Sequence, residues 1–223
     1  GNRRVWGLAT QLYSVRSAGS WGIGDLSDLT DLAVWAGSEH SAGYVLINPL
    51  HAAAPTSPME PSPYLPTSRR FVNPLYLRVQ AIPEYARVSK RGRLDKLRAG
   101  CVEGAAKSDI IDRDAAWDAK RSALKLVYRV PLSAGRQLAF EAFKRREGTA
   151  LDDFATWCAL AEKYGGDWRR WPAELHHPSS AAVAEFAEKN RRAVDFHRWL
   201  QWQLDDQLAH AQSQALRTGM TLG

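Results

Sequence analysis

The sequence predicts an α/β protein that holds part of a parallel sheet and a large helical region. Two apolar runs, residues 5–13 and 43–47, have the short, non-alternating character of buried parallel strands. The segment between them carries apolar residues at helical spacing, which makes a strand–helix–strand unit with a right-handed crossover. From about residue 85 the pattern is helical almost to the end. Two strands and a helical mass cannot bury both faces of a sheet, so we expect the N-terminal part of a larger α/β protein, truncated at both ends.

The first helix is predicted to begin at Asp25, after the small-residue loop 17–24. An Asp N-cap accepts hydrogen bonds from the free N–H groups of the first turn, and Asp28 three residues later completes a capping box. The loop also contains Gly22 and Gly24, a Gly-x-Gly pair typical of dinucleotide-binding turns. The third glycine of that fingerprint is missing and the loop is too long for such a turn, so we discount nucleotide binding.

Residues 48–76 form the segment around which the rest of the chain is arranged. Seven prolines fix its backbone angle φ and remove backbone donors, so it can be neither helix nor central strand. It also carries large apolar and aromatic residues, which a solvated linker lacks. A stiff, aromatic loop at the carboxyl end of a strand is where α/β enzymes place substrate-binding groups. The alternative is a rigid surface loop that binds no ligand.

Beyond this segment, residues 77–82 are predicted to be a short extended piece, as in a β-ribbon. Helical patterns then cover residues 114–128, 133–147 and 151–164. Residues 180–217 keep a helical apolar spacing that fits either two helices end to end or one helix packed on several partners. The closing residues 220–222 read as the start of another strand.

Composition excludes several classes of protein. No run of 18 apolar residues could span a membrane, and the first residues lack the apolar core of a signal peptide. Cys101 and Cys158 are too few for a disulfide framework, which indicates a reducing, cytoplasmic setting. The net charge of +6 comes from basic residues interleaved with acidic ones along the helices. That pattern is typical of solvated helix faces, so neither nucleic acid nor a membrane is an expected partner.

Clusters that could bind a metal or catalyse a reaction are not found in the sequence. His176 and His177 are adjacent and lack the spacing of a metal pair. The pairs Asp152–Asp153 and Asp205–Asp206 lie in helical patterns, where neighbouring residues point about 100° apart, so we interpret them as surface or capping acids. Most of the nine tryptophans are expected to fill helix interfaces, although such a number is also typical of proteins that stack sugars on aromatic rings.

Four stretches of the chain carry a specific resemblance to a known family. The strongest are SPYLPTSR at residues 62–69 and FVNPLY at 71–76; WGIGDL at 21–26 and MTLG at 220–223 agree in order and place. In these motifs the chain resembles the amylomaltases, the 4-α-glucanotransferases of the α-amylase clan. The similarity extends over essentially the whole chain, although beyond residue 85 it is one of helix type and length.

The resemblance implies an α/β fold built as an incomplete (β/α)₈ TIM barrel, with its first two to three strands and a large inserted α-helical subdomain. The division that follows places the first βαβ unit and the Pro-rich substrate loop in residues 1–84, the inserted helical subdomain in 85–189, and the return helix with the start of the third barrel strand in 190–223. We expect an isolated chain of this kind to leave strand edges and apolar faces in water.

The chemistry implied by the resemblance is retaining transfer of α-1,4-glucan segments to the 4-hydroxyl of an acceptor, by double displacement and without a cofactor. The implied partners are α-1,4-glucans, maltooligosaccharides and glucose as acceptor. The family motifs that carry the nucleophile, the acid/base and the third carboxylate are not found, so we expect no catalytic residue and no metal ligand in this chain. The implied substrate-binding residues are Tyr64, Ser62 and Pro63. The residues expected to be structural at the site are Asn48, Asp25 and Asn73.

Two other functions stay open. A glucan hydrolase or debranching enzyme of the same clan would differ in the sequence that follows residue 223 and would release glucose. A non-catalytic helical interaction domain would use the proline-rich segment only as a brace, and maltotriose would then leave Tyr64 undisturbed.

Overall fold

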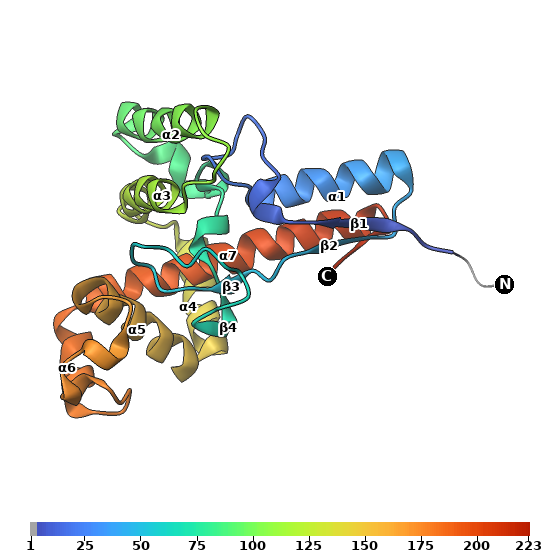
Figure 1. Ribbon diagram of the computed structural model, residues 1–223. Coiled ribbons are helices and arrows are strands. Elements are labelled where there is room, and N and C mark those ends of the chain that lie inside the picture. Colours follow the sequence, from blue (N-terminus) through green and yellow to red (C-terminus); the bar gives the residue numbers. More distant parts are fainter. Residues whose placement is uncertain (1–3) are drawn as a thin grey trace.

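Three short parallel strands form a sheet at one end of the molecule. The computed structural model describes residues 4–223, and the sheet contains β1 (Gly7–Thr10), β2 (Tyr44–Ile47) and β5 (Thr221–Leu222) in the order β1-β2-β5. Gly7 pairs with Tyr44 and Val45 pairs with Leu222, so β2 is central. Figure 1 shows the sheet on the right and most of the helices on the left. The predicted α/β class with a parallel sheet is confirmed.

Helix α1 (Leu26–His40) makes the crossover from β1 to β2. The predicted capping box is present: Asp25 accepts hydrogen bonds from the first turn, and the Asp28 carboxylate accepts one from the backbone N–H of Asp25. Gly24 is required for close approach, because a Cβ there would collide with the carbonyl oxygens of Leu12 and Val15. The loop before α1 therefore packs directly on the chain that leaves β1.

One face of the sheet is covered and the other is open. Helix α7 (Arg191–Arg217) runs the length of the molecule, packs beside α1 and leads into β5 (Figure 1). Val45 in the central strand is fully buried, whereas its neighbours Tyr44 and Leu46, which point to the other face, are about half exposed. A parallel sheet normally has both faces covered, whereas the face of this sheet that bears Tyr44 and Leu46 is open.

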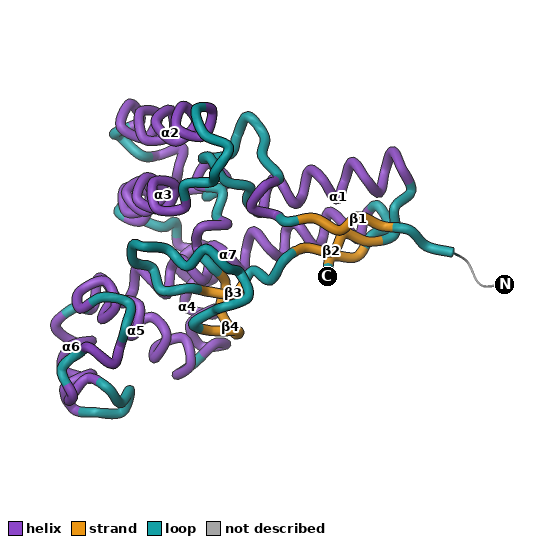
Figure 2. Tube along the Cα trace, in the orientation of Figure 1, coloured by secondary structure: helices purple, strands orange, loops and turns teal. Residues whose placement is uncertain are grey.

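The proline-rich segment contains a small antiparallel ribbon, β3 (His51–Ala52) with β4 (Ser68–Val72), apart from the parallel sheet (Figure 2). The predicted extended piece at residues 77–82 is wrong. Short 3₁₀ helices occupy that region, at Pro74–Tyr76, Val79–Ala81 and Pro83–Arg87. Proline at the first position of two of these turns presets the helical φ and needs no donor there. The first strand is also shorter than predicted, since it ends at Thr10 and a 3₁₀ helix follows at Leu12–Ser14.

The helical region follows the predicted patterns closely, with one omission. The three predicted helices are α3 (Arg113–Tyr128), α4 (Ala134–Glu147) and α5 (Thr149–Tyr164). The stretch 180–217 forms two helices, α6 (Ala181–Lys189) and α7, which meet at Asn190. Helix α2 (Arg91–Ala106) was missed because it is polar nearly all round, and Leu94 is its one buried residue.

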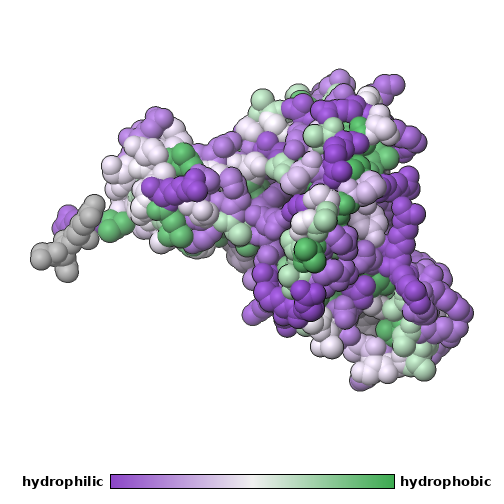
Figure 3. Space-filling model, turned by 180° about the vertical axis from the view of Figure 1, so that it is seen from behind, coloured by the Kyte–Doolittle hydropathy of each residue, from purple (hydrophilic) through white to green (hydrophobic). Residues whose placement is uncertain are grey.

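Tryptophan fills much of the interior, as predicted for most of the nine. Five tryptophans are buried: Trp21, Trp117, Trp171, Trp199 and Trp202. The tryptophans on α7 pack with other aromatic rings, for example Trp202 stacked on Phe140 of α4 at 5.0 Å between ring centroids. Seen from behind, the surface is mainly hydrophilic with small apolar patches (Figure 3).

Candidate functional site

Asn48 ties together the chain segments at the carboxyl ends of β1 and β2. Its side chain is buried, and its Oδ1 accepts a hydrogen bond of 2.7 Å from the Leu12 N–H. Its Nδ2 donates to the Pro49 carbonyl at 2.9 Å and to the Tyr76 hydroxyl at 3.0 Å. Burial is the main cause that raises the pKa of Tyr76, so its phenol stays neutral. One amide thus fixes the exits of two strands relative to the end of the proline-rich segment.

A buried charge network lies behind these strand ends. Arg78 Nε contacts Asp25 Oδ2 at 2.6 Å and Arg78 Nη2 contacts Asp28 Oδ1 at 2.7 Å, with both carboxylates almost fully buried. Burial raises the pKa of Asp25, although Lys120 and Arg78 oppose that effect. The carboxylates also accept the capping bonds of α1, and Asp28 accepts bonds from Ser17 and Ser20. Because their oxygens are committed in this way, neither acid is free to act on a substrate.

Lys120 is a fully buried cation in the same region. Its Nζ donates to the carbonyl oxygens of Leu75 and Leu77 at 2.6 and 3.0 Å. Burial lowers the pKa of Lys120 to about 8, against the attraction of Asp25. Lys120 belongs to α3, so this helix holds the backbone that follows the FVNPLY motif.

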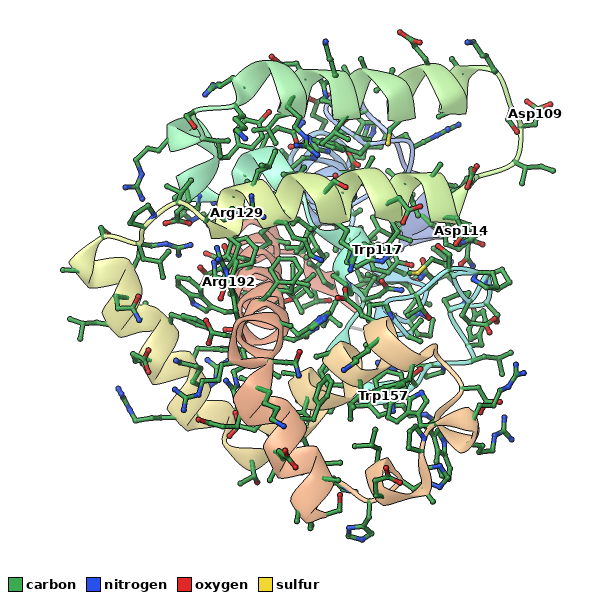
Figure 4. All side chains as sticks on the ribbon, turned by 90° about the vertical axis from the view of Figure 1, so that its left-hand side faces the viewer. Asp109, Asp114, Trp117, Arg129, Trp157 and Arg192 are labelled. Atoms are coloured by element: carbon green, nitrogen blue, oxygen red, sulfur yellow. The ribbon has the colours of Figure 1, made fainter. Side chains whose placement is uncertain are left out.

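Helix α3 also braces the middle of the proline-rich segment. Asp114 accepts a hydrogen bond of 2.7 Å from the Met59 N–H, and Trp117 Nε1 donates to the Pro55 carbonyl at 3.1 Å. In Figure 4 both labelled side chains, Asp114 and Trp117, lie at the same side of α3, next to this segment. The segment is therefore a fixed part of the fold over much of its length and not a free loop.

A small hollow lies where the proline-rich segment meets the strand ends. Ser62 and Pro63 line it, together with Glu60, Tyr13 and Arg113. Further lining comes from Pro49, His51, Asn73 and Tyr76. The Arg113 guanidinium lies over the Tyr13 ring at 4.9 Å from its centroid, a cation–π contact that holds both side chains at the rim. The Glu60 carboxylate accepts a hydrogen bond from the Ser62 N–H at 3.0 Å.

Tyr64 stands outside this hollow with its ring in solvent. It is 62% exposed, and its neighbour Leu65 is 66% exposed, at the outermost part of the proline-rich segment. Asn73, by contrast, lines the hollow and accepts a hydrogen bond from the Leu75 N–H at 3.0 Å, which caps the following 3₁₀ helix. The structure thus brings Ser62, Pro63, Asn48 and Asn73 to one place, buries Asp25 behind them, and leaves Tyr64 projecting beside them.

Of the four acids that are adjacent in sequence, three lie in surface ion pairs and Asp153 is exposed, consistent with their interpretation from sequence. Asp152 pairs with Arg198 at 2.8 Å, Asp205 with Arg146 at 2.8 Å and Asp206 with Arg136 at 2.7 Å. Of the acidic residues between 4 and 223, Glu60 is the one that lines the hollow at the strand ends. A retaining glycosyl transfer needs two carboxyl groups about 5 Å apart, and the hollow offers one.

Comparison with known proteins identifies the family. The family model described as 4-alpha-glucanotransferase matches residues 10–223. The chain belongs to the 4-alpha-glucanotransferase family. This confirms the resemblance seen in the SPYLPTSR and FVNPLY motifs.

Relatives within the 4-alpha-glucanotransferase family cover the whole of this chain but are much longer. A 4-alpha-glucanotransferase of Mycobacterium tuberculosis is 67% identical over 227 residues, which are 99% of this chain and 31% of the relative. That of Haemophilus influenzae is 32% identical over 100% of this chain and 34% of the relative. The chain thus spans about a third of the length of the curated relatives it matches.

Solved structures show the same fold. The amylomaltase from Corynebacterium glutamicum superposes with a TM-score of 0.79 and 40% sequence identity, over 97% of this chain and 29% of that one. The amylomaltase from Streptococcus agalactiae in complex with acarbose has a TM-score of 0.75 and 16% identity, over 99% and 42% of the two chains. At this low identity the second similarity concerns the fold alone.

Three residues that line the hollow were not predicted from the sequence: Tyr13, Tyr76 and Arg113. The sequence could have indicated Tyr13 and Tyr76, since both are aromatic rings with a polar hydroxyl. Tyr13 closely follows a strand, and Tyr76 ends the FVNPLY motif. Nothing in the sequence indicated Arg113, because it begins a helix 37 residues after Tyr76 and only the folded chain places it over Tyr13.

A larger cavity of about 540 Å³ lies between α5, α6 and the loop that joins them, and Thr67 of the proline-rich segment also lines it. Trp157, Trp168 and Trp171 line it, with Asp152 and Arg198 at its polar side. Trp171 Nε1 donates to the Gly165 carbonyl at 2.7 Å, and His176 Nε2 lies 2.9 Å from the Trp171 carbonyl oxygen. His176 is therefore engaged with its own loop. The bond to Gly165 fixes the indole of Trp171, while Trp168 is 47% exposed at the cavity rim.

Two general properties complete the description. Within residues 4–223, no three His, Cys, Asp or Glu side chains come together in a way that could hold a metal ion. Over the same residues, none of the helices combines the length and the apolar character needed to cross a lipid bilayer.

Proposed function

We propose that the protein carrying this chain is a 4-alpha-glucanotransferase that moves α-1,4-glucan segments to the 4-hydroxyl of an acceptor glucan or glucose. The reaction proceeds by retaining double displacement, in which a carboxylate attacks the anomeric carbon while an acid protonates the leaving oxygen. Family membership over residues 10–223 is the observation that carries the proposal. The chemistry exchanges one acetal bond for another, so it requires no redox or nucleotide cofactor.

The parallel strands supply the beginning of a (β/α)₈ barrel in this proposal. The parallel order β1-β2-β5, the connection of β1 to β2 through α1 and the open face that bears Tyr44 and Leu46 support it. Residues 1–84 then form the first βαβ unit with the substrate loop, 85–189 an inserted helical subdomain, and 190–223 the return helix with the third strand. The hydrogen bond of 3.0 Å from Gly223 N to the Val45 carbonyl oxygen supports the last assignment.

Tyr64, Ser62 and Pro63 form the sugar platform in this proposal. An exposed aromatic ring on a braced loop, at the carboxyl end of barrel strands, can stack on a glucose ring without first losing internal contacts. Asn48, Asp25 and Asn73 hold the backbone around it through the hydrogen bonds described above. The catalytic carboxylates are provided outside residues 1–223.

A glucan hydrolase of the same clan and a non-catalytic helical module are the competing functions. Product analysis of the full-length protein with maltotriose separates the first: a transferase yields a ladder of maltooligosaccharides, whereas a hydrolase yields shorter sugars and glucose alone. NMR titration of the ¹⁵N-labelled full-length protein with maltotriose separates the second, because a mere brace would give no shift at residues 62–64.

The isolated 223-residue chain is expected to catalyse nothing. Incubation with maltotriose should give no products above the buffer level, because Glu60 has no partner carboxyl at the strand ends. Turnover that disappears in Glu60→Gln would overturn this expectation. The cytoplasm is the proposed location, since both Cys101 and Cys158 are free thiols, which a reducing compartment preserves.

A further inference from the structure

A second pocket, of about 420 Å³, lies where α3, α5 and the α6–α7 junction meet. Its charged walls are Lys125 and Arg129 from α3, Glu162 from α5, and Lys189 and Arg192 from the junction. Phe196 and Tyr128 line the remaining part, with their rings edge to face at 5.3 Å. In Figure 4 the labelled Arg129 and Arg192 lie close together, on the opposite side of the view from Asp114 and Trp117. The pocket is thus separate from the proposed sugar platform.

The pocket carries more positive charge than its surroundings balance. Arg121, Lys125 and Arg129 follow one another at four-residue spacing on α3, where like charges destabilise a helix. Lys189 pairs with Glu185, but neither Arg129 nor Arg192 makes an ion pair or a side-chain hydrogen bond with any residue from 4 to 223. Burial and the nearby guanidinium groups of Arg121 and Arg129 lower the pKa of Lys125 against the attraction of Glu162. The positive charges that line the pocket therefore outnumber the carboxylates that could neutralise them.

The one carboxylate in the pocket wall does not supply the missing balance. Glu162 Oε1 accepts a bond of 2.7 Å from Arg121 Nε, and His197 Nε2 lies 3.6 Å from the same oxygen. Although burial opposes ionisation, His197 and Arg121 together lower the pKa of Glu162 to about 2. Lys125 Nζ is 3.9 Å from the other oxygen. The Glu162 charge is thus committed to Arg121, and Arg129 and Arg192 remain available.

We propose that this pocket binds the phosphate group of a small phosphomonoester. Two guanidinium groups from separate helices can each form a pair of N–H bonds with the oxygens of one phosphate group. A carboxylate has only two oxygens, so it can accept such a pair from one guanidinium group only. Phe196 and Tyr128 give the organic part of the ligand an apolar surface. The proposal is independent of the glucan chemistry.

The test is isothermal titration of the full-length protein with glucose 6-phosphate, inorganic phosphate, sulfate and glucose, at low and at physiological salt. We expect saturable binding of glucose 6-phosphate, weaker binding of inorganic phosphate, none of glucose, and loss of affinity as salt increases. Arg129→Gln and Arg192→Gln should each weaken glucose 6-phosphate binding about tenfold, through the loss of charge-assisted hydrogen bonds. Arg93→Gln, which changes an equally exposed arginine on α2, is the matched control.

Four results would overturn the proposal. The first is the absence of saturable heat with any phosphate. The second is equal affinity in the wild type and the Arg129→Gln/Arg192→Gln double variant. The third is an equal loss in Arg93→Gln, which would mean that net charge alone attracts the ligand. Equal binding of sulfate and glucose 6-phosphate would show a site for simple inorganic anions, and would contradict the ester. Because both arginines are exposed, circular dichroism should show unchanged folding in every variant.

Discussion

The two halves of the molecule are held together in different ways. Around the strand ends, buried polar side chains such as Asn48 and Asp28 each make several specific hydrogen bonds, so single atoms decide the geometry. In the helical region, apolar and aromatic packing dominates, and ion pairs such as Arg146–Asp205 have both partners about half exposed. A binding site whose atoms must be placed accurately needs specific hydrogen bonds, whereas a supporting helical region can rely on apolar packing.

Helix α7 joins the two halves through specific hydrogen bonds made by two of its side chains. Gln201 exchanges hydrogen bonds with both the N–H and the carbonyl of Val72, at 3.1 and 2.9 Å. Gln207 does the same with Arg78, at 2.9 and 2.8 Å. Each amide satisfies the N–H and the carbonyl of one residue, Val72 at the end of β4 and Arg78 just before a 3₁₀ helix. The helical region therefore fixes the position of the FVNPLY motif as well as its own core.

The largest expected effect contrasts a buried ion pair with an exposed one. Arg78→Met should destabilise the full-length protein by about 3–5 kcal/mol, because it leaves Asp25 and Asp28 buried without the guanidinium group that pairs with both of them. Arg146→Met removes an exposed pair and should change stability by at most about 1 kcal/mol. Urea unfolding curves of the two variants measure the difference. Similar losses in both would contradict the distinction between the two halves.

The sequence predicted those parts of the fold whose cause is local. The capping box at Asp25 and Asp28 and the ends of α4 and α5 depend on neighbouring residues, and they agree with the structure to within about two residues. The prolines excluded α-helix and central strand from residues 48–76, and the structure has neither there, although a 3₁₀ helix occupies Pro74–Tyr76. The parallel class followed from the two apolar runs, and the β5 strand from its position after a long helix.

What the sequence could not predict depends on contacts between distant residues. The periodicity of the sequence does not reveal the contact of Arg113 with the Tyr13 ring or that of Lys120 with the Leu75 carbonyl. Nor does it reveal the hydrogen bonds of the two glutamines of α7. The strand predicted for residues 77–82 was wrong for a related reason. Their apolar pattern fits a strand, but no strand lies beside them, and Gln207 of α7 accepts the hydrogen bond of the Arg78 N–H instead. Helix α2 failed because its surface position leaves almost no apolar stripe.

The next largest effect tests the exposed tip of the proline-rich segment. Tyr64→Ala should lower kcat/KM of the full-length protein for maltotriose by on the order of 10²-fold, through lost stacking and positioning. Its thermal stability should not change, because the ring is 62% exposed and packs on little. Leu65→Ala, at an equally exposed neighbour, is the control and should retain activity. Unchanged kinetics in Tyr64→Ala would remove Tyr64 from the sugar platform.

A smaller effect concerns the way in which the free energy of unfolding depends on pH because of Lys120, which lies at the junction between the halves. Its pKa of about 8 in the folded protein lies below 10.5, so the unfolded chain binds the proton more tightly between these values. The contribution of Lys120 to stability should therefore rise as pH increases from 7 to 9.5, by about 2 kcal/mol, and be lost again as pH falls through 8. Subtracting the profile of Lys120→Met from that of the wild type isolates this slope. A flat difference would mean that Lys120 keeps an ordinary pKa.

The smallest effect asks whether the helical half touches substrate. Trp168 and Trp35 are both 47% exposed, but Trp168 lies at the rim of the 540 Å³ cavity with Trp157 and Trp171, whereas Trp35 lies on α1 and packs on His40. We expect Trp168→Ala to raise KM for long glucans about fivefold, which corresponds to about 1 kcal/mol of lost aromatic contact. KM for maltotriose should stay unchanged, since the proposed binding hollow at the strand ends does not include Trp168 in its lining. Trp35→Ala should change neither constant. A loss for maltotriose as large as that for long glucans would show that Trp168 acts through folding, and no loss for either would leave the helical half as scaffold alone.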